Sequence, residues 1–530
     1  MMDHVKSACH EDHLDCPCTI FKVPEHIRQL DPKAYDPIVV PLGPFRCAHW
    51  SHSSVTLDHK RRYVWHLLSR HDGSEERANQ LLKECLMELK KRDKMVRHCY
   101  HPELPRELDA HNLASIMLLD GCFIIYLMLK MHAGKKGMDE ETEEDESKKR
   151  REWKIEMGED GRVLNVRKGH EQLEVPTVAG LFTINLVVYD LLKLENQIPF
   201  FIIELLFNHL KTPKDGQIGL VKLALQLFEG ILPEESESFK KKEKRCPGEY
   251  HHLLHLFYSS RIFVEKPQQH TSTPGCFHRA IKCMESKWKK SEVAIERTKS
   301  KGKETEAAIE CNKSKGKKVQ SSTSAPKWTP SATELDRAGV KFKVNKKADT
   351  FLDITFEQRK MEITPLLCLL KLYLMFRSGR MEIPPLQIYD YTGPLFQNLI
   401  AFEQCYLDSE MYFTTYALFM DCIIDKAEDV RLLHLEGILE HKLSSDRAVA
   451  EFFNKLGCQI HFTRKKNYLK NQIKRVNEFY DSRWHKWLAG LRRDYLGNPW
   501  AILSVLAAIF LLLLTIEQAV FSALSYLHSS

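Results

Sequence analysis

Hydrophobic and polar residues alternate along most of this chain with the period of an α-helix. Helical spacing of apolar positions covers five stretches: 57–95, 114–131, 181–194, 199–210 and 393 onward. Strand-like alternation is confined to Val340–Val344 and Phe351–Phe356, and Met361–Leu366 is nearly repeated by Met381–Leu386. We therefore predict a mainly α fold, a large helical domain with a small β element near 340–390.

The last apolar stretch is long enough to cross a membrane. Residues 500–516 contain no charge, and extension to residue 524 adds Glu517 and Gln518 near the far end. A bilayer core needs about 20 apolar residues at helical rise. We predict one C-terminal transmembrane helix over 500–524, with a buried core helix as the alternative. Four positions mark this span: Trp500, Ala501, Ile516 and Leu524.

Positive charges lie on one side of this segment. The membrane-proximal basic residues are Arg483, Lys486, Arg492 and Arg493, and no Lys or Arg follows the span. The positive-inside rule then places the N-terminal domain in the cytosol. Residues 1–18 are polar and lack the apolar run of a secretory leader. We expect a tail-anchored, single-pass protein of the plasma membrane or the endoplasmic reticulum.

A basic, amphipathic stalk helix is predicted over 465–499. Residues 464–493 contain ten Lys and Arg against Glu478 and Asp481. An apolar stripe follows at helical spacing: Leu469, Ile473, Val476, Tyr480, Trp484, Trp487 and Leu491. Two interpretations remain open. The stripe either rests on anionic lipid or packs against the globular domain.

Charge and composition divide the remaining chain. Residues 1–17 are a flexible His/Cys-rich tail, and 18–464 form the helical domain, with disordered insertions at about 135–175 and 287–327. A content of 43% hydrophobic and 28% charged residues excludes wholesale disorder. The 15 cysteines show no paired spacing, which indicates reduced intracellular thiols. A net charge of +7 over 530 residues makes nucleic acid an unlikely partner. The basic tract 287–318 keeps a nuclear nucleic-acid-associated protein as one alternative.

The chain lacks the sequence motifs of phosphate loops, dinucleotide turns, nucleophile elbows and zinc hydrolases. We therefore expect no cofactor, no metal and no enzymatic activity, and the sequence identifies no small-molecule substrate. Polar residues nevertheless interrupt apolar runs at Asp120, Glu195, Asn196, Gln197, Glu403 and Gln404. Such groups must be hydrogen-bonded when buried, so we interpret them as structural ties between helix ends and loops. The alternative is a cryptic enzyme that uses Glu195 and Glu403 as an acid/base pair.

Several stretches resemble a plant protein family catalogued as domain of unknown function 247, or UPF0481. The most specific are Leu194–Phe200 (LENQIPF) and Asn398–Gln404 (NLIAFEQ), and further matches extend from Ile20–Pro24 to Asn498–Trp500. The near-repeat at 361–380 resembles an insertion into this pattern. The resemblance implies a mostly helical, membrane-associated protein without established enzymatic activity. Some relatives in grasses are tied to pollen–stigma self-incompatibility, which suggests a role in recognition through a protein partner.

Overall fold

The computed structural model of the chain describes thirteen stretches of residues: 18–46, 54–71, 74–135, 153–157, 163–168, 181–215, 218–231, 250–262, 329–359, 378–406, 409–463, 466–481 and 499–529. Helices dominate these stretches, and the strands are few and short. The prediction of a mainly α fold is confirmed. Three predicted features fall outside the described residues: the N-terminal tail 1–17, the basic insertion 287–327, and the membrane-proximal residues Arg483, Lys486, Arg492 and Arg493.

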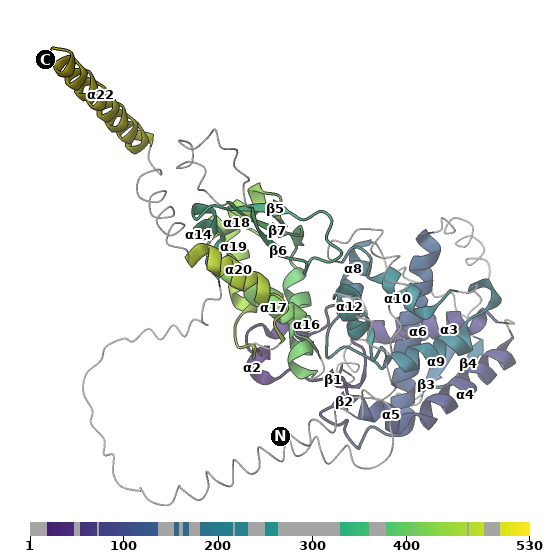
Figure 1. The fold of residues 1–530 in the computed structure, drawn as a ribbon. Coiled ribbons are helices and arrows are strands. Elements are labelled where there is room, and N and C mark those ends of the chain that lie inside the picture. Colours follow the sequence, from purple (N-terminus) through teal and green to yellow (C-terminus); the bar gives the residue numbers. More distant parts are fainter. Residues whose placement is uncertain are drawn as a thin grey trace, which may run out of the picture. The chain divides into compact units, whose positions relative to one another are not determined.

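The first half of the chain is built around one long helix, α6 (Ala110–Lys135), which packs against α3, α4, α9 and α10 (Figure 1). The elements before it are β1 (Ile20–Phe21), α2 (Glu25–Arg28), the 3-10 turn η1 (Pro32–Tyr35), α3 (Ser54–Ser69), α4 (Glu75–Lys91), α5 (Asp93–His98) and β2 (Tyr100–His101). Those after it are β3 (Trp153–Met157), β4 (Val163–Lys168), α8 (Leu181–Asp190), α9 (Phe200–Leu210), η3 (Pro213–Asp215), α10 (Leu220–Leu227) and α12 (Leu253–Arg261).

Helix α6 is the one helix whose described side chains form a stretch long and apolar enough to cross a membrane, by length and composition. Its apolar window, however, is 83% buried inside the protein. Gly121 allows α9 to approach closely, because a Cβ atom there would lie 2.4 Å from Leu206 Cδ1. The hydrophobicity of α6 is thus used by the protein core.

Strands β3 and β4 correct one prediction. They pair antiparallel within 135–175, where we expected a disordered insertion. The hairpin contacts α3 and α4, and Val163 is fully buried. The charge block at 139–154 dominates the local composition and therefore predicts disorder. The strands form nevertheless, because their contacts with two helices stabilise them.

The second half contains a three-stranded sheet in the order β5-β7-β6, in which β5 runs parallel and β6 antiparallel to the central β7. Its first elements are α14 (Ala332–Arg337), β5 (Val340–Val344), β6 (Thr355–Arg359), β7 (Ser378–Ile383), β8 (Leu386–Ile388) and α16 (Thr392–Cys405). The remaining ones are α17 (Tyr412–Ile423), α18 (Ala427–Leu435), β9 (Leu439–His441), α19 (Asp446–Leu456), α20 (Lys470–Asp481) and α22 (Pro499–Ser529). Ser331 and Glu334 form a capping box at the start of α14.

The β element lies within the predicted region, with one shift. Strand β5 coincides with the predicted strand at 340–344, whereas the second strand is 355–359 and not 351–356. Phe351 and Leu352 instead form a buried turn, in which the Phe351 ring meets Phe396 and Tyr416 edge-on. The first near-repeat copy, 361–366, lies outside the described residues, and the second copy supplies the end of β7.

The predicted stalk is described over 466–481, which includes α20, and at its last residue. The buried residues of α20 are Ile473, Val476 and Phe479, and it packs against β6. The Gln472 side chain accepts a hydrogen bond from the Phe356 backbone N–H of that strand at 3.1 Å. Over this stretch the apolar stripe therefore faces the domain, which decides between the two interpretations there. Phe479 takes the buried position that the stripe assigned to Tyr480.

Helix α22 runs unbroken through the predicted span and contains Trp500, Ala501 and Leu524 (Figure 1). Its described apolar side chains are exposed, from Phe510 through Phe521, and Ile516 is 53% exposed. The described side chains form a continuous stretch only over 510–522, and this apolar stretch is too short to cross a membrane by itself. By length and composition of the described side chains, α6 and not the predicted C-terminal span is therefore long and apolar enough to cross a membrane.

Candidate functional site

The polar residues of the Leu194–Phe200 stretch surround an extended segment from the start of the chain, residues 18–46, which we call the strap. Helix α8 ends at Asp190, and the following turn carries Glu195, Asn196 and Gln197 before α9 begins at Phe200. The turn has little regular structure of its own. Its side chains are buried, so they bind backbone groups of the strap and of neighbouring turns.

Asp190 holds the middle of the strap. Its buried carboxylate accepts hydrogen bonds from three successive backbone N–H groups, those of residues 38–40, at 2.6–3.0 Å. Burial raises the pKa of Asp190, and the three N–H donors oppose this effect because they stabilise the anion. Asn196 extends the contact, accepting from Leu42 N–H at 2.6 Å and donating to Val40 O at 3.0 Å.

Asp120 fixes the next turn of the strap together with Lys60. The two charged groups are 2.5 Å apart, and both side chains are buried, at 0% and 2% exposure. Asp120 also accepts from Gly43 N–H at 2.7 Å, and Lys60 donates to Pro41 O at 2.6 Å. Burial raises the pKa of Asp120, an effect that the adjacent Lys60 charge counteracts. The pair therefore joins α3, α6 and the strap.

Glu195 binds the two ends of the strap. Its carboxylate accepts from Val23 N–H at 2.8 Å, and it forms ion pairs with Arg28 at 2.5 Å and Arg46 at 2.9 Å. Gln197 lies behind it and donates to Leu191 O and Lys193 O, while its side-chain oxygen accepts from Leu254 N–H. Both N–H donors of the Gln197 amide are therefore used within the turn, and its oxygen is used by α12.

Glu403 and Gln404 lie in a different place and serve α17. The Glu403 carboxylate accepts from the N–H groups of Phe413 and Thr414, at 2.9 and 2.7 Å, in the first turn of that helix. A carboxylate at this position satisfies N–H groups that have no partner within the helix. Burial raises the pKa of Glu403 to about 7. Gln404 accepts from His461 N–H at 3.0 Å. Glu195 and Glu403 therefore bind different partners, and neither lines the hollow described below.

Three residues that sequence reasoning did not single out complete the strap contacts. Asn398 of α16 accepts from Leu194 N–H at 2.8 Å and donates to Ala34 O at 2.9 Å, so it joins three distant segments. The other two residues are Asp190 and Lys60. Asp190 and Asn398 both lie inside or next to apolar runs, the same signal that identified Asp120. Lys60 lies in a charged stretch and carries no such signal.

A histidine cluster at the start of α12 closes the strap's first residues. His252 Nδ1 accepts from His255 N–H at 3.2 Å, so its Nε2 carries the proton and donates to Thr19 O at 3.2 Å. His255 Nδ1 accepts from His251 N–H at 3.3 Å. Both rings are thus held neutral by backbone donors. Burial lowers the pKa of His255 to about 3 and that of His252 well below its ordinary value.

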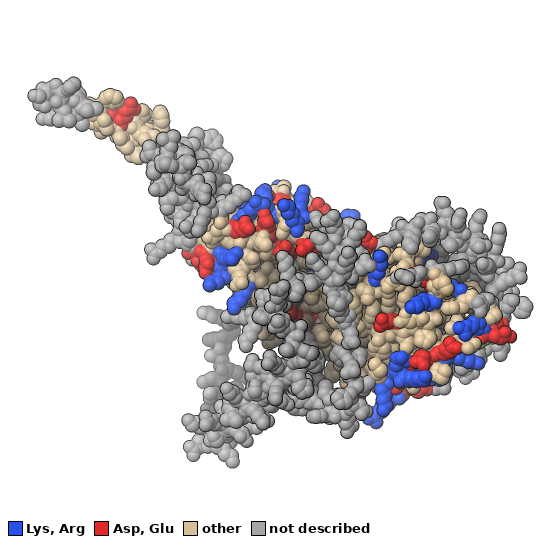
Figure 2. Space-filling view, turned by 45° about the vertical axis from the view of Figure 1, so that its right-hand side comes forward, with Lys and Arg blue, Asp and Glu red and all other residues tan. Residues whose placement is uncertain are grey.

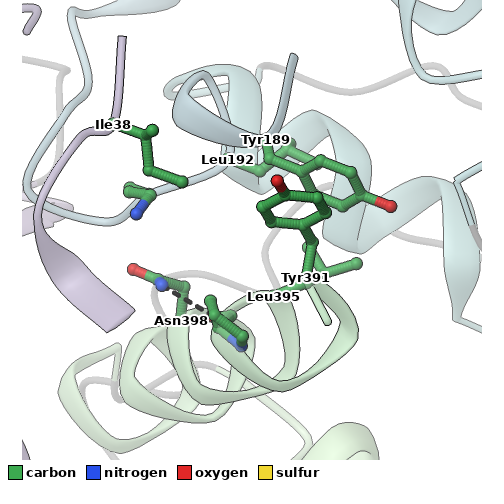
Figure 3. Close-up of a pocket in the computed structure, with 8 residues that line it drawn as sticks. Ile38, Tyr189, Leu192, Tyr391, Leu395 and Asn398 are labelled. Carbon is green, nitrogen blue, oxygen red and sulfur yellow. Dashed lines mark hydrogen bonds between the residues drawn. The ribbon is translucent and has the colours of Figure 1, made fainter. Parts of the chain in front are cut away.

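A small hollow opens beside these contacts (Figure 3). Tyr189 and Tyr391 stack at 5.2 Å between ring centroids, and Ile38 lies across from them above Asn398. The enclosed space is about 10 Å³, room for roughly one water molecule. The Asn398 amide is saturated by backbone partners, so the hollow presents mainly apolar surface. Among the described residues, no group of His, Cys, Asp and Glu side chains is placed to hold a metal ion.

Comparisons with known proteins agree with the resemblance found in the sequence. The family model described as plant protein of unknown function, DUF247, matches residues 20–514. The UPF0481 protein At3g47200 of Arabidopsis thaliana is 27% identical over 96% of this chain and 87% of its own length. The putative UPF0481 protein At3g02645 of the same plant is 23% identical over 94% of this chain and 89% of its own length. No solved structure matches the chain.

Proposed function

The chain belongs to the DUF247 family of plant proteins of unknown function, and from this premise we propose that it is a membrane-anchored component of protein recognition or signalling that acts by binding and not by catalysis. The observation that carries the proposal is the exposed, apolar helix α22. The described apolar side chains from Phe510 to Phe521 are exposed, although burial is the ordinary fate of such residues in water.

The dimensions of α22 suit a bilayer. Its 31 residues extend about 46 Å at 1.5 Å per residue, against a hydrocarbon thickness of about 30 Å. Thr515, one of its few polar residues, donates its hydroxyl to Leu511 O at 2.7 Å and so needs no water. On the face shown in Figure 2, acidic and basic side chains mix over the described surface, whereas the described part of α22 is uncharged except for one acidic residue.

Helix α6 is the competing candidate for a membrane span, and its contacts argue against it. Most of its apolar residues are consumed by packing against α3, α4, α9 and α10. Extraction of α6 into lipid would expose the partner faces of four helices. The basic residues before α22 favour an orientation with the N-terminal domain in the cytosol, in the plasma membrane or the endoplasmic reticulum.

A binding role is favoured over catalysis by the state of the two candidate carboxylates. Glu195 is engaged by Val23, Arg28 and Arg46, and Glu403 by the first turn of α17. An acid/base pair needs both groups within reach of one substrate proton. These carboxylates instead meet buried protein partners.

The anchoring proposal is tested by alkaline carbonate extraction of the full chain beside a version that ends at Asp494. We expect the full chain to stay in the membrane pellet and the shortened one to move to the supernatant. A full chain with Leu512→Arg and Leu513→Arg provides a second arm, because each central arginine costs about 2.5–3.5 kcal/mol of insertion free energy. Release of the unsubstituted full chain by carbonate contradicts the proposal.

The non-catalytic part is tested with Glu403→Gln in the natural plant host. The amide keeps an oxygen acceptor for α17 but cannot exchange a proton as a carboxylate does. We expect a folded, membrane-bound variant to replace the natural protein fully. A variant that is folded and anchored but inactive would favour the enzyme alternative.

A further inference from the structure

Helix α20 has two faces of opposite character. Its apolar face packs against β6. The opposite face carries three exposed basic side chains, Lys470, Lys474 and Arg475, which we call the basic face. The Lys474 side chain is 73% exposed, and its Nζ lies 3.7 Å from a Glu478 carboxylate oxygen. Among the residues that the structure describes, Lys470 and Arg475 form no ion pair. The domain thus uses the apolar face of α20 and leaves its basic face open to solvent.

The order of charges along α20 is the reverse of the order that stabilises a helix. Its first turn contains no acidic residue and its last turn no basic one. Lys470 and Lys474 lie towards the positive N-terminal end of the helix dipole, whereas Glu478 and Asp481 lie towards the negative end. Lys474 precedes Glu478, which is the weaker orientation for an ion pair four residues apart. The two lysines are therefore not placed to stabilise α20, and the positive charge of its first two turns is available to an anionic partner.

The length of chain between α20 and α22 keeps the basic face near the proposed membrane span. Seventeen residues, 482–498, separate the end of α20 from the start of α22. Even fully extended, they cover at most about 60 Å, at about 3.3–3.6 Å per residue. An anchored chain therefore holds the basic face permanently within reach of one leaflet, so that a weak attraction suffices for contact. On the proposed orientation this is the cytosolic leaflet, which carries anionic lipid.

We propose that the basic face of α20 docks onto the anionic lipid headgroups of the membrane in which α22 is anchored. This inference rests on the proposed membrane anchor. The contact is electrostatic and stays at the headgroup surface, because the apolar face that could enter lipid is packed against β6. Helix α20 is joined to this strand by the hydrogen bond between Gln472 and the Phe356 backbone as well as by its buried side chains. Docking of the basic face therefore fixes how the domain that contains β6 is presented at the membrane.

Energy transfer from a fluorophore at position 471 to labelled lipid headgroups tests the contact. Asn471 is exposed beside the basic face, and an unnatural amino acid at this position carries the fluorophore. The full chain is inserted into vesicles of phosphatidylcholine, with or without phosphatidylserine. We expect several-fold higher transfer in the anionic vesicles, and its loss in about 1 M salt, where the screening length falls from about 8 to about 3 Å. Equal transfer in both kinds of vesicle, or additional transfer that salt does not reduce, overturns the proposal.

Two sets of substitutions sharpen the test. Lys470→Gln, Lys474→Gln and Arg475→Gln together remove the basic face. Each basic residue near an anionic surface changes the docking equilibrium about five-fold, so the ratio of docked to undocked helix should fall by about 100-fold. The matched control replaces three exposed lysines of α4 and α5 by Gln, at Lys83, Lys90 and Lys94, and should keep the transfer of the natural chain. An equal loss of transfer in both sets overturns the proposal.

Two further measurements on the same samples separate the possible failures. Urea unfolding should show the variant without the basic face to be at least as stable as the natural chain, because Lys470 and Lys474 oppose the helix dipole. A marked loss of stability would show that these side chains are structural and overturns the proposal. In carbonate extraction, loss of insertion refutes the anchor, whereas insertion without lipid-dependent transfer refutes only the docking of α20.

Discussion

Breaking the buried Lys60–Asp120 pair should reveal how strongly the strap is held. Substitution of Lys60 by Met keeps most of the side-chain volume but leaves the Asp120 carboxylate with a single donor, Gly43 N–H. Both groups are buried, so solvent does not take over the role of the ammonium group. Removal of one partner from a buried pair costs about 3–5 kcal/mol. This is a large part of the stability of about 5–15 kcal/mol that a folded domain has.

The second variant in this experiment adds Asp120→Asn to Lys60→Met. The asparagine is uncharged and still offers an oxygen to Gly43 N–H. We therefore expect the double variant to be more stable than Lys60→Met alone, although it carries one more substitution. Such recovery isolates the buried charge as the cause, because loss of packing alone would make the two substitutions additive.

The pH dependence provides an independent check. In Lys60→Met, the pKa of Asp120 is raised by burial without the opposing lysine, while the unfolded chain keeps an ordinary value near 3.9. A folded-state pKa above the unfolded value gives stability at low pH that is lost as the pH rises through the folded pKa. The deficit of Lys60→Met relative to the natural chain should therefore shrink as the pH falls from 7 toward 4.

Urea unfolding of the full chain in mild detergent, followed by circular dichroism, measures these differences. Lys90→Met on the exposed face of α4 is the matched control and should stay within about 0.5 kcal/mol of the natural chain. A Lys60→Met variant that loses less than 1 kcal/mol, or a double variant no better than the single one, would refute the reasoning.

Three further predictions use the same unfolding assay. His252→Asn keeps an N-cap acceptor but removes a ring that stays neutral in the folded chain. Because unfolded histidine is protonated below about pH 6.5, the natural chain should lose stability as the pH falls from 6.5 to 5, and the variant should gain about 2 kcal/mol in free energy of unfolding relative to it. A difference that stays constant over this pH range would contradict the prediction. Gly43→Ala places a Cβ atom 2.5 Å from Gln197 O at φ +73° and should cost clearly more than Gly230→Ala, which has φ +84° but open space. Replacement of residues 360–377 by Asn-Gly should leave the β6–β7 hairpin folded, because Arg359 and Ser378 are paired directly on either side of the segment. The shorter loop costs less entropy to close, so the free energy of unfolding should rise by up to about 2 kcal/mol. A variant that unfolds would show that the segment belongs to the core.

Local patterns in the sequence predicted elements whose causes are local. The alternation of Val340–Val344 and the apolar length of α6 and α22 each arise from neighbouring residues. The hairpin β3–β4 was missed because its strands are short and follow a charge block, and its stability depends on α3 and α4. Periodicity assigned Tyr480 to the buried face of α20, while contact with Phe356 on β6 selects Phe479 instead.

The strap contacts mark the limit of such reasoning. The sequence identified Asp120, Glu195, Asn196 and Gln197 as polar residues that need partners, because each interrupts an apolar run. It contained no sign of which partners they have. Asp190 binds backbone groups about 150 positions earlier, and Asn398 reaches more than 200 positions back to Leu194. Backbone N–H groups are present in every residue, so their pairing is decided only when the chain is folded.

The strap contacts also fix the backbone that carries the exposed side chain of Ile38. Ile38 is 56% exposed, yet its own N–H and those of the next two residues are held by one carboxylate. An apolar side chain on a freely moving loop would lose little by folding back onto the protein, but the Asp190 contacts prevent this. The stacked Tyr189 and Tyr391 rings lie beside it, at the end of α8 and immediately before α16. Buried polar groups here keep apolar groups in a fixed place at the surface, and a preformed surface loses less conformational entropy on binding a partner. A preformed surface of this kind supports the proposed role in recognition over the enzyme alternative.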